Sequence, residues 1–184
     1  MMMMMSESCL TQEHPTCPTQ TIKAPYLLGL AAAGDVLLVD TFIKYVIFHE
    51  VPLGQSIPML QNVMSLTHVH NTGVAFSLLH TLPVWGLGVL AFALLGGLTT
   101  LLLAGKPNKS QALALGLMLG GGLNNVLNRL SFGFVVDYIQ LDFVNFAIFN
   151  LSDMAVCIGA VWLAWQTLQN TPSKTLTQGG NECR

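Results

Sequence analysis

Long apolar segments alternate with short polar ones along most of this chain. Four segments are predominantly apolar, and they cover residues 26–48, 82–104, 112–127 and 146–168. Each is close to the roughly 20 residues that an α-helix needs to cross a hydrocarbon core about 30 Å thick. The third is the shortest, and it ends at the polar pair Asn124 and Asn125. The pattern predicts an all-α membrane protein with four transmembrane helices.

The connecting segments 49–80 and 128–149 follow a different pattern. Residues 63–79 and 132–143 mix β-branched and aromatic residues with glycine. Such runs, bounded by turn residues, are typical of short strands. We therefore expect a small β-rich cap that folds over one mouth of the helix bundle.

Composition strengthens the membrane assignment. Only 9% of the residues are charged and 52% are hydrophobic, whereas a soluble domain has roughly 25% charged residues. The net charge of −2 argues against a nucleic-acid partner. We expect one membrane domain, residues 26–168, between a disordered N-terminal tail (1–25) and a C-terminal tail (169–184).

The basic residues predict the orientation of the four spans. Five of the seven lysines and arginines precede the first span, lie between the second and third, or follow the fourth: Lys23, Lys106, Lys109, Lys174 and Arg184. Segments 49–80 and 130–149 contain no lysine or arginine. Because cytoplasmic loops are enriched in these residues, both tails should be cytoplasmic and the β-rich cap extracytoplasmic. Trp162 and Trp165 fit an aromatic belt near the inner face.

Neither the cysteines nor the histidines predict a metal site. The cysteines are Cys9, Cys17, Cys157 and Cys183, and no two have the C-x-x-C spacing. We expect Cys157 to be buried as a small apolar residue. His68 and His70 lack further ligands at a zinc spacing. We therefore expect neither a metal nor a cofactor.

Two acids, Asp137 and Asp153, flank the start of the fourth apolar segment. An ionisable group at membrane depth costs a few kcal/mol on insertion scales, so such groups are commonly functional. Two neighbouring carboxylates favour sharing one proton, which suits acid–base chemistry. A structural alternative exists for Asp153, because Asn150 lies three residues earlier as a suitable helix cap and a first-turn acid complements the helix dipole.

Two further polar pairs lie at helical spacing. Asp40 and Lys44 are four apart with the acid first, which favours an intrahelical ion pair, either as simple neutralisation or as part of a site. Asn125 and Arg129 are also four apart and present an amide and a cation on one face. Arg129 either reaches lipid headgroups or holds a carboxylate or a substrate carbonyl.

The outward segment contains Asn71 and Gly73, which suit a tight turn. Glycine also gives room for a ligand to approach the backbone. Both interpretations remain open from the residues alone.

Five motifs in order resemble the lipoprotein signal peptidases, also called type II signal peptidases, over residues 26–168. The motifs are Asp40-x-x-x-Lys44, Asn71-x-Gly73-x-Ala75-Phe76-Ser77, Gly121 to Arg129, Val135-Val136-Asp137-Tyr138-Ile139 and Phe149-Asn150-x-x-Asp153. The resemblance implies that Asp137 and Asp153 form a catalytic dyad. It implies substrate-binding positions at Asp40, Lys44, Asn71, Gly73, Asn125, Arg129 and Asn150.

Three positions depart from the family pattern. Asn128 replaces the usual acid before the arginine, Thr41 replaces a glutamine, and Ile43 replaces a small hydroxyl residue. The loss of an acid beside Arg129 leaves this cation freer to pair with a dyad carboxylate.

The resemblance implies an aspartyl endopeptidase of the bacterial inner membrane. It would remove the signal peptide from diacylglyceryl-modified prolipoproteins by cleaving just before the lipidated cysteine, act as a monomer among membrane lipids, and need no cofactor. One alternative is a small transport or channel subunit that uses Asp40, Asp137 and Asp153 as a proton or cation relay. The clustering of two acids outside favours the protease. A catalytically silent homologue that binds lipidated peptides remains a third reading.

Overall fold

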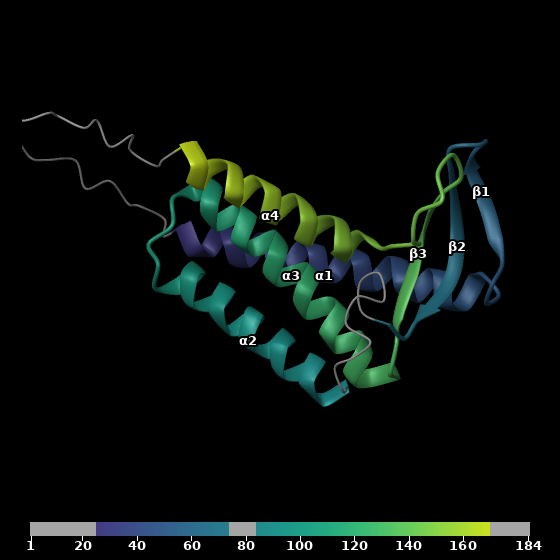
Figure 1. Ribbon diagram of the computed structural model, residues 1–184, viewed down its shortest axis with the longest axis horizontal. Coiled ribbons are helices and arrows are strands. Elements are labelled where there is room, and N and C mark those ends of the chain that lie inside the picture. Colours follow the sequence, from purple (N-terminus) through teal and green to yellow (C-terminus); the bar gives the residue numbers. More distant parts are fainter. Residues whose placement is uncertain (1–24, 74–83, 170–184) are drawn as a thin grey trace, which may run out of the picture.

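The computed structural model describes residues 25–73 and 84–169. Both expected tails and the motif residues Ala75, Phe76 and Ser77 lie outside the described residues. The helices are α1 (Pro25–Glu50), α2 (Val84–Leu103), α3 (Lys109–Phe132) and α4 (Leu151–Gln169). The strands are β1 (Ser56–Leu60), β2 (Met64–Asn71) and β3 (Val135–Leu141), as Figure 1 shows. The expectation of a helical protein with a small β-rich cap is confirmed at this level.

Helix α3 is the centre of the bundle, because it contacts α1, α2 and α4. Glycines make the closest approaches. A side chain at Gly116 would collide with the backbone of Gly29, and one at Gly120 with the backbone of Ala33, so α1 and α3 pack backbone to backbone. Gly121 gives the same room to the backbone of Ser152 at the start of α4.

The sheet lies at one end of the bundle. In Figure 1, α1 and α3 begin at the end opposite the sheet, and α2 and α4 finish there. Successive helices therefore run in opposite directions. Strands β1 and β2, which follow α1, and β3, which follows α3, lie at one end of the bundle, which is where the acid-bearing motifs were predicted.

The three strands form an antiparallel sheet in the order β1-β2-β3. Two strands were expected within 63–79 and 132–143 and are present as β2 and β3, whereas β1 was not anticipated. All five residues of β1 are exposed, so its sequence carries no alternation of buried and exposed positions. It pairs with β2 through a turn in which Asn62 has a φ of 59°. Beneath the sheet, Ile47, Val51, Val136 and Tyr138 form a core that joins β3 to the end of α1.

Two helices differ in extent from the apolar segments that predicted them. Helix α3 continues past residue 127 to Phe132, because its asparagines find partners inside the bundle, and it ends where Gly133 adopts a φ of 81°. Helix α4 begins at Leu151 instead of residue 146. The preceding Phe149 pairs with Ile139 as an isolated β-bridge, so residues 146–150 follow the edge of the sheet.

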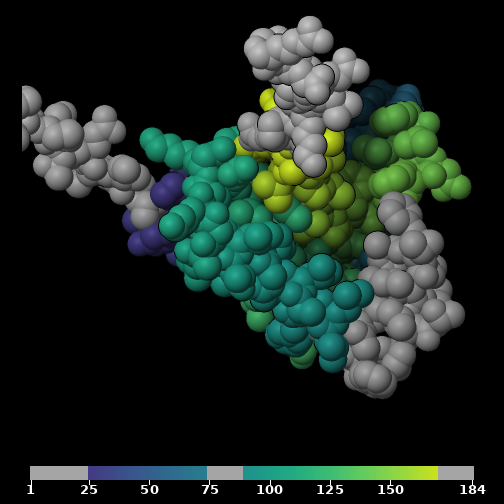
Figure 2. Space-filling view, turned by 60° about the vertical axis from the view of Figure 1, so that its left-hand side comes forward, coloured from purple at the N-terminus to yellow at the C-terminus, as the bar shows by residue number. Residues whose placement is uncertain are grey.

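The outer surface of the bundle is apolar. Within the described residues, α1 and α4 are long and apolar enough to cross a membrane, and the apolar stretch Val89–Leu103 of α2 is shorter. Large apolar side chains such as Leu38, Phe42, Phe92 and Val161 are exposed on the helices. The space-filling view shows α2 (teal) and α4 (yellow) at this surface (Figure 2). Exposed apolar area of this extent marks a surface that is covered by another apolar phase.

Candidate active site

Asp137 is enclosed by neutral hydrogen-bond donors. It lies in β3 and is only 2% exposed. The Asn71 amide donates to Oδ2 at 2.8 Å, and the Asn150 amide donates to Oδ1 at 2.6 Å. Burial raises the pKa of Asp137 to about 6, against the opposing effect of the two amides, and the neighbouring Asp153 adds to the rise. The carboxyl can therefore change its protonation state near neutral pH.

Asp153 lies in the first turn of α4. Its Oδ1 accepts a hydrogen bond from the Asn125 amide at 2.8 Å, and its Oδ2 accepts one from the Asn150 backbone N–H at 3.2 Å. The Asp153 backbone N–H in turn donates to Asn150 Oδ1 at 2.9 Å. The expected helix cap is thus present, and the helix N-terminus favours a negative charge at this position.

Asn150 connects the two acids. Its side chain is fully buried, and it contacts Asp137 through the amide nitrogen and the Asp153 backbone through the amide oxygen. Asn125 lies beside them, with its Oδ1 3.4 Å from the Asn150 amide nitrogen. Two acids from a strand and a helix are thereby gathered around one amide side chain, which is an arrangement suited to shared proton chemistry.

Asp40 and Lys44 form the predicted ion pair, with Lys44 Nζ 2.9 Å from Asp40 Oδ2. Asp40 is fully buried and Lys44 is 4% exposed. The Lys44 ammonium also donates to Asn125 Oδ1 at 2.8 Å. The ion pair is therefore linked to the candidate site through Asn125.

Three polar residues around Asp40 were missed in the sequence reading. Tyr138 donates to Asp40 Oδ1 at 2.7 Å, Asn124 donates to Oδ2 at 2.8 Å, and the Ser152 hydroxyl donates to the same Oδ2. Each directly precedes or follows a predicted site residue in the sequence. A polar residue in an apolar stretch next to such a position is the signal that could have identified them.

Asn71, Gly73 and Arg129 come together at the rim of the site. Asn71 Oδ1 accepts a hydrogen bond from the Gly73 N–H at 2.9 Å, which closes the expected turn. Arg129 donates from Nη2 to the Gly73 carbonyl at 3.0 Å. Within the described part of the chain, Arg129 makes no ion pair with either acid, in contrast to the pairing anticipated from Asn128. The Asn128 amide instead donates to the Asn124 carbonyl, one helical turn earlier, at 3.0 Å.

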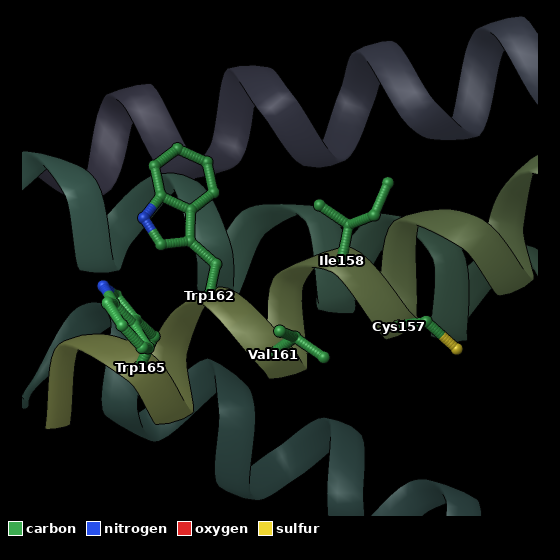
Figure 3. A pocket seen from close by; sticks show the side chains of 5 residues that line it. All are labelled: Cys157, Ile158, Val161, Trp162 and Trp165. Atoms are coloured by element: carbon green, nitrogen blue, oxygen red, sulfur yellow. The ribbon is translucent and has the colours of Figure 1, made fainter. Parts of the chain in front are cut away.

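A separate hollow lies along the outer side of α4 (Figure 3). Its lining residues are Cys157, Ile158, Val161, Trp162 and Trp165, none of them acidic. Cys157 is exposed here, so the expectation that it is buried is wrong. Asp35 is also exposed and contributes nothing to the site around Asp137 and Asp153.

Comparison with known proteins agrees with the motifs. The sequence profile of the family described as Signal peptidase (SPase) II matches residues 32–169. The lipoprotein signal peptidase of Nostoc sp. (strain PCC 7120) is 38% identical over 146 residues, which cover 77% of this chain and 90% of the relative. That of Brevibacillus brevis (strain 47) is 35% identical over 127 residues, which cover 69% of this chain and 85% of the relative.

Two solved structures share the fold. Both are bacterial membrane enzymes determined by the in meso method, at 2.3 Å and 1.9 Å resolution. Their TM-scores are 0.73 and 0.67 at 24% and 22% sequence identity. The similarity covers 85% and 78% of this chain and 94% of each of the solved chains. The profile match and the full-length relatives show that this chain belongs to the signal peptidase II family of aspartic endopeptidases.

Proposed function

We propose that this chain removes the signal peptide from diacylglyceryl-modified prolipoproteins by cleaving the peptide bond just before the lipidated cysteine. The observation that carries the proposal is the contact of Asn150 with both acids, Asp137 through its amide nitrogen and Asp153 through its amide oxygen. The many relatives named lipoprotein signal peptidase support the substrate class. Asp137 and Asp153 are the proposed catalytic dyad.

The two acids have different environments, and this difference supports different roles. Each acid accepts two N–H donors, but only Asp153 also lies at a helix N-terminus, where the helix dipole favours the carboxylate. Burial holds the pKa of Asp137 at about 6, which favours a carboxyl that keeps its proton for longer as the pH rises. We assign Asp153 as the general base and Asp137 as the general acid of the resting enzyme.

The reaction follows from these roles. Asp153 takes a proton from a water molecule while the Asp137 proton polarises the scissile carbonyl, and the water oxygen attacks the carbonyl carbon. The tetrahedral intermediate collapses when Asp153 passes the proton that it took from water to the departing amine, the C–N bond breaks, and Asp137 keeps or recovers its own proton as the new carbonyl forms. The new carboxyl belongs to the released signal peptide, and the new amine belongs to the lipidated cysteine.

Partly buried groups at the rim are suited to hold the peptide. Asn71, Gly73, Asn125 and Arg129 lie around the two acids and offer amide and guanidinium donors to substrate carbonyls. Asn150, Asp40 and Lys44 are more deeply buried, so their proposed contribution to substrate binding runs through the rim residues.

We propose that all four helices span the bacterial inner membrane, with both termini in the cytoplasm and the dyad at the extracytoplasmic face. The alternating helix directions and the absence of lysine and arginine from residues 49–80 support this topology (Figure 1). Substrate acyl chains would then remain in lipid while the peptide reaches the sheet. Lipids would also cover the apolar outer surface of the helices.

Cysteine labelling tests the topology. In a variant without native cysteines, Gln61→Cys in the turn between β1 and β2 should react with an impermeant thiol reagent added from outside. Lys109→Cys should react only after the membrane is opened. Lys109 is preferred to the adjacent Asn108, because Asn108 caps α3 through Gln111. The reverse labelling pattern would overturn the orientation.

Processing of a reporter tests the function. The purified protein, incubated with a prolipoprotein carrying diacylglycerol on its cysteine, should release a signal peptide and leave cysteine as the new N-terminus. The same reporter without lipid should remain uncut. Binding of the lipidated reporter without cleavage would support the silent homologue. Ion flux in proteoliposomes, in the absence of cleavage, would support the transport alternative.

A further inference from the structure

The carboxylate of Asp40 is the point at which α1, α3, α4 and β3 meet. Its Oδ1 accepts from the Tyr138 hydroxyl of β3 at 2.7 Å. Its Oδ2 accepts from the Asn124 amide of α3 at 2.8 Å, from the Ser152 hydroxyl of α4, and from Lys44 of its own helix at 2.9 Å. Asp40 is fully buried, and Tyr138, Asn124 and Ser152 are at most 2% exposed. Because Asp40 is fully buried and already has four donors, its carboxylate is not accessible to a substrate.

Each partner from another element is the direct sequence neighbour of a residue at the dyad. Tyr138 follows Asp137, and Ser152 precedes Asp153. Asn124 precedes Asn125, whose amide donates to Asp153. Because adjacent residues share a peptide unit, anchoring one fixes the Cα position of the next. Asp40 therefore anchors the backbone on either side of the two proposed catalytic acids.

Tyr138 makes a second contact that ties the strand to the helix. Its hydroxyl oxygen accepts a hydrogen bond from the Leu151 backbone N–H, the first residue of α4, at 3.1 Å. This N–H belongs to the first turn of the helix and has no partner within it. Burial and the Asp40 carboxylate raise the pKa of the Tyr138 hydroxyl, so the group remains protonated and donates to Asp40. One hydroxyl thus links α1, β3 and the start of α4.

We propose that Asp40 is a positioning residue that acts through Tyr138 and Ser152 to fix the separation of the Asp137 and Asp153 carboxylates. The inference rests on the proposed dyad and reassigns Asp40 from substrate contact to catalytic geometry. Asp40 governs the chemical step and leaves substrate affinity nearly unchanged. Lys44 compensates its charge and extends the same unit to Asn125.

Small changes of geometry have large effects on such a site. Displacement of a catalytic group by about 1 Å costs up to about a hundredfold in rate. The other links between β3 and the start of α4 are the Phe149 bridge to Ile139 and Tyr138, and the Asn150 amide. These links hold Asp137 relative to Asn150. The Asp40 unit adds polar links from α1 to the residues next to both acids, beside the apolar contacts of Ile47 with β3.

The test removes one hydroxyl at a time and measures kcat and KM separately on the lipidated reporter. Tyr138→Phe and Ser152→Ala should each lower kcat about tenfold or more, with KM within about twofold of the wild-type value. Both should also displace the pH dependence of kcat, because the mutual influence of the two acids depends on their separation. The matched controls are Thr67→Val and Ser65→Ala. These remove buried hydroxyls that bond Gln140 and Asp142 in the same sheet, and kcat should be unchanged.

The outcomes separate this inference from the proposed function. If Asp137→Asn abolishes cleavage while Tyr138→Phe and Ser152→Ala keep the wild-type kcat, the dyad stands and the positioning role is wrong. A rise in KM with kcat unchanged would return Asp40 to substrate binding. An equal fall of kcat in the control variants at an equal loss of thermal stability would show a merely structural effect. If Asp137→Asn cleaves normally, the proposed function itself fails. Should Tyr138→Phe not fold, Ser152→Ala decides, since it removes a single oxygen.

Discussion

Asp40 and Asp137 are both almost completely buried, at 0% and 2% exposure, yet their surroundings are opposite. Asp40 has a lysine ammonium at 2.9 Å together with two hydroxyl groups and an amide. Asp137 has two asparagine amides and no cation within hydrogen-bonding distance among the described residues. The same type of side chain therefore occurs once with its negative charge compensated by a cation and once with neutral hydrogen-bond donors alone.

The comparison shows two ways in which a membrane protein accommodates a buried carboxylate. A buried carboxylate without a cation is costly, and the usual response is a shift of its pKa toward the neutral form. At Asp137 this shift brings the pKa to about 6, where a proton can be gained or lost during a reaction. At Asp40 the ion pair and the hydrogen-bond donors hold the carboxylate in a fixed position. The proposed proton chemistry uses the acid whose charge is not compensated by a cation.

The largest expected effect follows from removing the uncompensated acid or its partner. Asp137→Asn and Asp153→Asn should each lower processing of a lipidated reporter by at least a factor of about 10²–10⁴, the usual contribution of a general acid or base. Asparagine keeps the size of the side chain, so insertion and thermal stability should persist. Measurable cleavage by either purified variant at near-normal rate would reject the dyad.

Breaking the Asp40–Lys44 ion pair should lower the stability of the protein as well as its activity. Asp40→Asn leaves the buried Lys44 ammonium without its carboxylate, and the loss of one partner of a buried pair typically costs about 3–5 kcal/mol. The free energy of unfolding in detergent micelles measures this cost. The double variant Asp40→Asn/Lys44→Met removes the orphaned charge and should regain part of the stability. If Asp40→Asn is as stable as the wild type, the ion pair is not the anchor described here.

The pH dependence of processing should reveal the effect of the two amide donors on the pKa of Asp137. If Asp137 must be protonated, processing falls as the pH rises through about 6. The Asn71 amide stabilises the carboxylate, so Asn71→Ala should raise the pKa and move this fall to higher pH. A hydrogen bond to a charged group contributes about 1.5–3 kcal/mol, which corresponds to about one to two pH units.

The control for this shift is Gln61→Ala in the exposed turn between β1 and β2, which should leave the profile unchanged. A fall that moves to lower pH in Asn71→Ala would contradict the assigned effect of the amide. A limb that rises with pH near 6 in the wild type would instead make Asp137 the base and Asp153 the acid.

The smallest effect is expected at a third acid near the sheet. Asp142 lies five residues after Asp137 but is exposed, and it accepts a hydrogen bond from the Ser65 hydroxyl at 2.7 Å. Asp142→Asn should leave processing within about twofold of the wild type, since exposed polar substitutions rarely change stability by more than about 0.5 kcal/mol. A larger loss would mean that burial does not distinguish the functional acids from their neighbours.

Local spacing was enough to predict several parts of the site. The Asp40–Lys44 ion pair follows from two residues four apart on one helix, and the Asn150–Asp153 cap follows from the first turn of another. The apolar segments predicted the helices, and runs of β-branched and aromatic residues predicted β2 and β3. The family motifs added Asp137 and Asp153 as a pair. All these features depend on residues close in the chain or on a recognisable pattern.

Other features depended on packing between distant segments. Tyr138 and Ser152 reach Asp40 across 98 and 112 residues, and no local pattern encodes those contacts. Arg129 was free to pair with a carboxylate by composition, but the position of the turn at Gly73 gives it a carbonyl. Cys157 lies on the outer side of α4 because the rotation of a helix that is apolar on all sides is set by its neighbours and not by its own sequence.

The sequence by itself thus indicated which segments are helical, which acids to propose as the dyad and which family the chain resembles, because these depend on composition and on residues within a few positions of each other. Only the tertiary structure showed that Asp40 is paired with an ammonium and that Asp137 is bonded by two neutral amides. Whether a buried carboxylate meets an ammonium or two amides depends on how α1, α3, α4 and the sheet pack together, and that is a property of the whole fold.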